Sequence, residues 1–325
     1  MMRNQVLGSV FIMLAVVVGN CALASETTSQ SGETLKPVTV AFIGDQGINN
    51  NSRAVLQLIK DEGADLVLHQ GDLDYENNPA KWDTFITNVL GVDFPYLASV
   101  GNHDRFWHAA NGYQEKLQAR LDRIEEMSCS GDLGVQSVCT FRGLFFILSG
   151  IGTTIPKNDP DHVAYIRKQL AQTNSIWRIC SWHKSQKRMQ VGEKGNEVGW
   201  KPFKACRKGG AIVATGHTHS YSRTHLMSSF KKQSIASTAN KLVIEEGRSF
   251  AFVSGLGGLS IRRQYRRNDP WWARVYTLDQ KANFGALFCT YFVNSKPNQA
   301  NCYFKDIDGN IPDKFELISK VKAHY

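Results

Sequence analysis

Short apolar segments that end in polar loops recur along this chain and constrain its fold more than any other feature. In the clearest of them, at residues 64–75, an apolar run at 66–68 predicts a buried strand, and Gly71 permits a sharp turn after it. Asp72 and Tyr75 then lie at the carboxyl end of the strand, the edge where open α/β sheets bind ligands. The segment predicts an α/β fold whose functional side chains share one sheet edge.

Strand, loop and helix alternate over the first part of the chain. This alternation indicates a parallel sheet with right-handed crossovers. Early strands are predicted at residues 37–43, 66–68 and 96–100, with helices starting after Asn49 and at Pro79. Further strands are expected at 141–149, 176–182 and 211–215, and further helices at 113–127, 161–171 and 200–207. Alternating segments at 249–254, 284–293 and 301–304 predict antiparallel strands.

The first residues have the pattern of an export signal. Arg3 precedes an apolar run at residues 6–18, and a small-residue Ala-Leu-Ala sequence ends at residue 24. We therefore predict a signal peptide at residues 1–24, a polar linker at 25–36 and a single catalytic domain at 37–325. The apolar run is too short for a membrane anchor, so we expect a soluble secreted or periplasmic protein.

Net charge and cysteine content indicate possible partners and the redox compartment. The formal net charge of +9 favours anionic partners such as phosphate esters, nucleic acid or an acidic surface, although basicity also serves solubility. Of the seven cysteines, all but Cys21 remain after the predicted cleavage, and we expect neighbours along the chain to form disulfides. A zinc site at Cys180 and His183 is the weaker alternative. The expected pairs are Cys129 with Cys139, Cys180 with Cys206, and Cys289 with Cys302.

Side chains that bind metal ions or transfer protons follow five of the predicted strands. Strand ends on one sheet edge bring such side chains together, so we expect them to converge. A carboxylate such as Asp72 can bridge two cations, and a phenol such as Tyr75 favours a hard trivalent ion over zinc. The candidates are Asp45, Asp72, Tyr75, Asn102, His103, His183, His217 and His219.

In order and spacing these residues resemble the purple acid phosphatases, which belong to the calcineurin-like metallophosphoesterases. The resemblance runs from residue 39 to residue 223, and segments 252–258 and 306–309 look like the family's closing strands. It implies an α/β fold in which a β-sandwich of two mixed sheets is flanked by helices, in α/β/β/α layers. The matching motifs are Asp-x-Gly at 45–47, Gly-Asp-x-x-Tyr at 71–75, Gly-Asn-His-Asp at 101–104, a histidine at His183 and Gly-His-x-His at 216–219.

The resemblance also implies a dinuclear metal centre with ferric iron and a divalent iron, zinc or manganese ion. Related phosphodiesterases carry a histidine ligand at the position of Gly47, and a glycine there leaves space for Tyr75. Asp45, Tyr75 and His219 would bind the ferric ion, Asn102, His183 and His217 would bind the divalent ion, and Asp72 would bridge the two.

Several other polar residues are candidates for contact with a substrate. His103 follows a ligand directly, so we expect it to bind phosphate and to protonate the leaving group, while Asp104 either orients His103 or caps the loop. His108 is a candidate second phosphate contact. Lys184, Lys187 and Arg188 either contact substrate phosphates or form a solvated loop. The basic run at 262–267, with Trp271 and Trp272, either binds nucleic acid or a sugar phosphate or forms a lid on the final strands.

The resemblance implies an exported acid phosphatase that hydrolyses small phosphate monoesters by attack of a metal-bound hydroxide, with no need for nucleic acid. Two alternatives stay open. One is a phosphodiesterase or nucleotide hydrolase that uses the same metals. The other is a secreted binding protein that keeps the fold without turnover. The oligomeric state is left open.

Overall fold

The computed structural model of the protein describes residues 35–153, 161–266 and 269–323. The signal peptide predicted at residues 1–24 and nearly all of the linker predicted at 25–36 lie outside these ranges. Residues from Leu35 onward form one compact unit. Within the described ranges, no helix has the length and apolar character needed to span a membrane.

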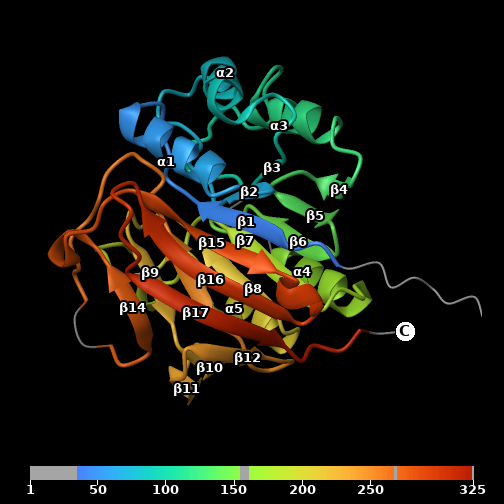
Figure 1. Cartoon of the computed structure of the whole chain (residues 1–325), viewed down its shortest axis with the longest axis vertical. Helices are drawn as coiled ribbons and strands as arrows, with labels where there is room; N and C mark the ends of the chain where they lie inside the picture. The colour runs from blue at the N-terminus through green and yellow to red at the C-terminus, as the bar shows by residue number, and fades with distance from the viewer. Residues whose placement is uncertain (1–34, 154–160, 267–268, 324–325) are drawn as a thin grey trace, which may run out of the picture. The chain divides into compact units, whose positions relative to one another are not determined.

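Two large mixed sheets form the centre of this unit (Figure 1). In the described residues, the first sheet has seven strands in the order β12-β17-β16-β15-β1-β2-β3, and the second has eight in the order β14-β9-β13-β8-β7-β6-β5-β4. The first contains β1 (Val38–Ile43), β2 (Leu66–His69), β3 (Tyr96–Ala98), β12 (Lys241–Ile244), β15 (Gly285–Tyr291), β16 (Gln299–Asp306) and β17 (Asp313–Ser319). The second contains β4 (Met127–Asp132), β5 (Gln136–Phe141), β6 (Leu144–Ser149), β7 (Trp177–Trp182), β8 (Ile212–Thr215), β9 (Tyr221–Thr224), β13 (Ala251–Ser254) and β14 (Trp272–Tyr276). A separate hairpin pairs β10 (Leu226–Ser229) with β11 (Ser234–Ser237).

The two sheets pack face to face through a buried apolar layer. Phe42 of β1 and Phe252 of β13 meet edge to face with their ring centroids 5.2 Å apart. The Ser254 hydroxyl donates to the carbonyl of Phe42 at 2.7 Å, which joins the same two strands across the layer. Both aromatic side chains are almost fully buried, so the hydrophobic effect holds the sheets together.

Helices cover the outer faces of the sandwich. The helices α1 (Asn50–Asp61), α2 (Pro79–Leu90) and α3 (Tyr113–Leu121) lie on the first sheet, where α1 contacts β15 and α3 contacts β3. The helices α4 (Asp161–Gln172) and α5 (Trp200–Lys208) lie on the second sheet and pack on each other. Asn49 caps α1 by accepting the backbone N–H of Ser52. The predicted α/β/β/α sandwich is confirmed.

Two boundaries predicted from the sequence are wrong. The helix expected at residues 113–127 ends at Leu121, and Met127 begins β4 instead. The strand expected at 141–149 is interrupted by Arg142 and Gly143, which both have positive φ. Two residues in this conformation make a tight hairpin, so β5 ends at Phe141 and β6 begins at Leu144. The Cys129–Cys139 segment forms the β4–β5 hairpin.

Three disulfides join the six described cysteines in the predicted pairs. Cys129–Cys139 and Cys289–Cys302 connect directly opposite residues of paired strands, and Cys180–Cys206 connects β7 to α5. Nearest-neighbour pairing is therefore confirmed. Because its sulfur is bonded to that of Cys206, Cys180 does not form the alternative zinc site with His183.

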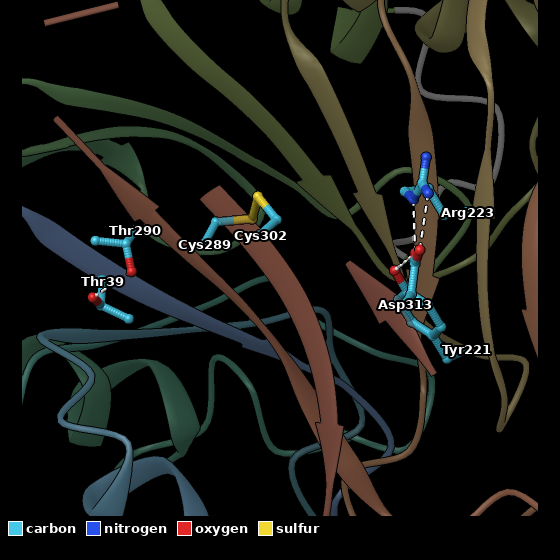
Figure 2. The surroundings of a disulfide bond; sticks show 7 residues. All are labelled: Thr39, Tyr221, Arg223, Cys289, Thr290, Cys302 and Asp313. Atoms are coloured by element: carbon cyan, nitrogen blue, oxygen red, sulfur yellow. Dashed lines mark hydrogen bonds and ion pairs between the residues drawn. A yellow bond between two sulfur atoms is a disulfide. The ribbon is translucent and has the colours of Figure 1, made fainter. Parts of the chain in front are cut away.

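A buried ion pair links the two sheets near one of these disulfides (Figure 2). The Asp313 carboxylate of β17 accepts hydrogen bonds from the Arg223 guanidinium of β9 at 2.7 and 2.9 Å, and from the Tyr221 hydroxyl at 2.7 Å. Figure 2 also shows Cys289–Cys302 between this cluster and the contact of the Thr39 and Thr290 hydroxyls. All three members of the cluster are buried, so the carboxylate satisfies the charge of Arg223 away from water.

Candidate metal centre

Five strand ends deliver the predicted site residues to one place. The parallel strands β1, β2 and β3 of the first sheet end before Asp45, Asp72 and Asn102, and the parallel strands β7 and β8 of the second sheet end before His183 and His217. The loops approach closely: a Cβ on Gly101 would lie 2.1 Å from the backbone nitrogen of Asp72. The candidate centre therefore straddles the junction of the two sheets.

Three of these residues have positive φ angles, a backbone conformation that residues other than glycine seldom adopt. Asp45, Asp72 and His217 have φ angles of 57°, 60° and 70°. Such conformations cost free energy and persist where the surroundings enforce them. Here the backbone N–H of His217 donates to Oδ2 of Asp45 at 2.8 Å, and that of His103 donates to Oδ1 of Asp72 at 2.9 Å. These bonds aim the side chains at a common centre.

One half of the centre gathers Asp45, Tyr75 and His219 around Asp72. The Tyr75 hydroxyl lies 3.2 Å from Oδ1 of Asp45 and 3.1 Å from Oδ2 of Asp72. Nε2 of His219 lies 3.4 Å from the same hydroxyl and 3.3 Å from Oδ1 of Asp45. A Cβ on Gly47 would lie 3.8 Å from the Tyr75 ring, so the ring occupies the space beside this glycine.

The other half gathers His183 and His217 on the opposite side of Asp72. Nε2 of His183 lies 3.2 Å from Oδ2 of Asp72 and 3.1 Å from Nδ1 of His217. Ligand atoms of Asp72, His183 and His217 all lie within 4.8 Å of one another, and all three residues are buried. Oδ2 of Asp72 thus belongs to both halves. Oδ1 of Asn102 is buried and accepts no hydrogen bond from a described residue.

The outward contacts of the histidines leave lone pairs directed inward. Nδ1 of His183 lies 2.8 Å from the carbonyl oxygen of Gln70, which can only accept, so the proton belongs on Nδ1. Nε2 of His217 lies 2.8 Å from Oε2 of Glu197, an ionic contact that lacks hydrogen-bond geometry. Nδ1 of His219 contacts the Ser260 hydroxyl at 2.5 Å. Imidazole nitrogens and carboxylate oxygens close to one another, together with a buried amide oxygen that has no donor among the described residues, fit a cation site.

The electrostatics of the centre in the absence of a metal also favour a cation among its carboxylates. Burial and the charges of Asp45 and Asp72 raise the pKa of Tyr75 far above its usual value. Burial opposes ionisation of Asp72, yet the neighbouring His183 outweighs it and lowers the pKa of that carboxyl. Burial likewise opposes the charge on His183, but Asp72 raises the pKa of the imidazole to about 9. Without metal, a proton on His183 therefore balances the charge of Asp72.

His103 and Asp104, the predicted catalytic residues, lie on the loop after β3. The His103 ring packs against the Tyr75 ring with centroids 4.5 Å apart, at the edge of the centre. The buried Asp104 carboxylate accepts the backbone N–H groups of Gly101, Asp72 and Leu73 at 2.6, 3.0 and 2.8 Å. Two roles were expected for Asp104, orienting His103 or capping the loop. These hydrogen bonds support the loop cap.

Glu197 is a residue at the centre that the sequence analysis did not identify. Its Oε1 pairs with Lys184 at 3.1 Å while Oε2 contacts His217. Burial opposes its ionisation, but His217 and Lys184 lower the pKa of Glu197 to about 2. Glu197 lies on the loop between β7 and α5, which has no apolar periodicity. The sequence therefore showed only an acidic residue in the loop after His183 and did not indicate its contact.

Several other candidates make contacts outside the donor set. His108 is exposed and pairs with Asp132 at 3.1 Å. The guanidinium of Arg188 contacts Gln233 on the surface. Trp271 is fully buried and packs with Trp200 and Trp272. This packing favours a lid over a binding surface for the segment that carries Trp271.

Residues 38–221 match the family model described as calcineurin-like phosphoesterase. Over 84 residues the chain is 36% identical to a protein of Arabidopsis thaliana named "probable inactive purple acid phosphatase 1". That match covers 23% of this chain and 14% of the plant protein.

Solved structures share the fold at low sequence identity. The chain superposes on purple acid phosphatase PPD1 from seeds of yellow lupin (Lupinus luteus) with a TM-score of 0.65 and 19% identity, covering 88% of this chain and 54% of that one. It superposes on GAP50, the anchor in the inner membrane complex of Plasmodium, with a TM-score of 0.59 and 12% identity, covering 88% and 90%. The chain thus spans about half the length of PPD1, and these similarities concern the fold.

Proposed function

The chain belongs to the calcineurin-like phosphoesterase family, and on this premise we propose that it is an exported acid phosphatase that hydrolyses small phosphate monoesters at a dinuclear metal centre. The observation that carries the proposal is the position of Asp72. One carboxylate oxygen, Oδ2, lies between the Tyr75 hydroxyl at 3.1 Å and Nε2 of His183 at 3.2 Å, so a single residue serves both halves of the donor set.

The donor types suggest how the two halves would be filled. Asp45, Tyr75 and His219 offer two anionic oxygens and a nitrogen, which suit a hard trivalent ion such as ferric iron. Asn102, His183 and His217 offer a neutral oxygen and two nitrogens, which suit a divalent ion such as iron, zinc or manganese. A trivalent ion would reverse the raised pKa of Tyr75 and bind it as phenolate.

A pair of bound cations would neutralise the phosphate and lower the pKa of water for an attack on phosphorus. The chain's own residues would orient this chemistry. Asp72 would fix the separation of the two ions, and Glu197 would hold the tautomer of His217. His103 would bind the phosphate and donate a proton to the leaving alkoxide, since its ring lies against Tyr75 at the edge of the centre.

Export is part of the same proposal. Three disulfides require an oxidising environment to form and persist, which supports a secreted or periplasmic location. The proposed substrates are small-molecule phosphate esters, and the proposal requires no nucleic acid.

A binding protein without turnover is the second candidate. It is favoured by the comparisons, since the similar plant protein is named inactive and GAP50 is named an anchor. The seven candidate ligands in this chain argue for metal binding and turnover.

Turnover of a phosphate monoester and a phosphate diester by the purified, metal-loaded protein tests the proposal. We expect p-nitrophenyl phosphate to be hydrolysed at least tenfold faster than bis-p-nitrophenyl phosphate. His217→Ala, which removes a proposed ligand, should abolish both activities, and Lys241→Ala, on the exposed outermost strand β12, should leave them unchanged. Faster diester cleavage would favour the diesterase alternative, and metal binding without turnover would favour the binding protein.

A further inference from the structure

Two cationic side chains lie beside the candidate metal centre and have no ion-pair partner among the described residues. Lys194, on the loop between β7 and α5, is half-buried and is within electrostatic range of Asp45, Asp72 and Glu197. Arg262, on the segment that follows β13, is also half-buried, and its Nε is buried without a hydrogen-bond partner among the described residues. The two cations are close enough to repel each other.

The backbone holds both cations at this edge. The backbone N–H of Arg262 donates to the carbonyl of His219 at 2.8 Å, which anchors its segment to a proposed ligand. The loop of Lys194 is anchored through the buried Gln190, which accepts from the Thr218 hydroxyl at 2.5 Å and donates to the carbonyl of Gly195 at 3.1 Å. Thr218 separates the proposed ligands His217 and His219.

The two segments also hold each other. The backbone N–H groups of Tyr265 and Arg266 both donate to the carbonyl of Val191. A Cβ on Gly192 would lie 2.6 Å from the side chain of Thr218, so only a glycine lets the loop approach Thr218 this closely, and the Arg262 side chain lies at van der Waals distance from the same position. The loop that carries Lys194 and the segment that carries Arg262 are therefore joined before any ligand binds.

The carboxylates near the pair are committed elsewhere. Asp45 and Asp72 belong to the proposed metal ligands, and Glu197 contacts His217 and Lys184. Partly buried cations that repel each other and lack a paired anion are unfavourable unless a ligand supplies the charge. An arrangement of this kind beside a catalytic centre is typical of an anion-binding subsite.

We propose that Lys194 and Arg262 form a subsite for a second anionic group on the substrate, so that the preferred substrates are phosphate monoesters of alcohols that carry a further phosphate or carboxylate. This inference rests on the proposed phosphatase function, in which the metals hold the phosphate that is cleaved. The second anion would lie between the ammonium and the guanidinium, and each would contribute a charge-assisted hydrogen bond.

Binding of non-hydrolysable probes of matched length tests the subsite independently of turnover. Isothermal titration calorimetry of the metal-loaded protein would compare propylphosphonate, 3-phosphonopropanoate and propane-1,3-bisphosphonate. We expect at least one of the two probes with a second anion to bind about tenfold or more tightly than propylphosphonate, which corresponds to one charge-assisted hydrogen bond. The comparison of the two distinguishes a carboxylate subsite from a phosphate subsite.

Charge-removing variants identify the residues. Lys194→Gln and Arg262→Gln should each reduce the preference for the second anion about tenfold while propylphosphonate binding changes little. Arg263→Gln is the matched control, because Arg263 is exposed and pairs with Asp279 at 3.3 Å. Chelation of the metals by a probe would be the same in every variant and would not follow the substitutions.

Equal binding of all three probes by the unmodified protein would overturn the subsite. A uniform loss of affinity for all three probes in both variants would also overturn it, because the pair would then bind the phosphate common to every monoester. The subsite would also be overturned if Lys194→Gln and Arg262→Gln both kept the full preference for probes with a second anion. If the preference is found and follows the two residues but no ester is hydrolysed, the subsite stands and the phosphatase proposal fails.

Discussion

Oε2 of Glu197 lies 2.8 Å from Nε2 of His217, while Nδ1 of the same ring faces His183 at 3.1 Å. A carboxylate behind a ligand histidine fixes the ring and its tautomer and makes the inward nitrogen a better ligand. The site is thus organised by a loop between β7 and α5 as well as by the strand ends that carry the ligands.

We predict that Glu197→Gln weakens the binding of one of the two metals about tenfold or more, because the loss of such a partner typically reduces metal affinity by this order. Metal content after dialysis against a graded chelator measures the effect. Glu193→Gln, a substitution of an exposed glutamate in the same loop, is the control and should retain both metals. Equal retention in the two variants would contradict the role assigned to Glu197.

Asp104→Ala should destabilise the protein by about 3 kcal/mol or more, since three backbone N–H groups lose a charged acceptor. Urea-induced unfolding of the metal-free protein gives this value directly. A variant with full stability and reduced turnover would instead support the alternative in which Asp104 orients His103.

His69 gives the metal-free protein a specific pH dependence. Burial lowers the pKa of this histidine to about 3, so in the folded protein the ring stays neutral at pH values where the unfolded chain, with a pKa near 6.5, takes up a proton. Stability should therefore fall as the pH drops from about 6.5 towards 3, by up to about 1.4 kcal/mol per pH unit from this residue. His69→Asn should reduce the slope of unfolding free energy against pH by this amount, and an unchanged slope would show that His69 is protonated in the folded protein.

Removal of one partner of the buried Arg223–Asp313 ion pair should lower the free energy of unfolding strongly. Asp313→Asn leaves the Arg223 guanidinium buried without its counter-charge, and we expect a loss of about 3–5 kcal/mol in unfolding free energy. Removal of the exposed Lys241–Glu316 pair, at 2.8 Å on a neighbouring part of the first sheet, should cost less than about 1 kcal/mol. Similar losses in both experiments would mean that the link between the sheets through Arg223 contributes little.

The strand ends could be predicted because buried strands are short apolar runs, and the residue after each run is placed by the sheet itself. Asp45, Asp72 and His217 follow this rule, and their convergence needed no further information. The fold class followed from the same pattern together with a family resemblance. The hairpin turn at Arg142 was missed because a positive φ at arginine has no signature in the residue type.

The supporting residues could not be predicted in the same way. Glu197 and Lys194 come from an irregular loop whose path is determined by tertiary contacts, such as the bond from the Thr218 hydroxyl to Gln190. Spacing along the chain says nothing about such contacts. Strand β17 was also not predicted, because the exposed charged residues Lys314 and Glu316 interrupt its apolar run.

The central claim is that Asp45, Tyr75 and His219 bind ferric iron beside a divalent ion bridged by Asp72. Metal analysis and the visible spectrum of the purified protein, beside its Tyr75→Phe variant, test this most directly. We predict about one equivalent of iron and a visible phenolate-to-iron charge-transfer band that disappears in the variant. Two bound metals without such a band would contradict the ferric assignment, and a protein that binds no metal would contradict the account of the site as a whole.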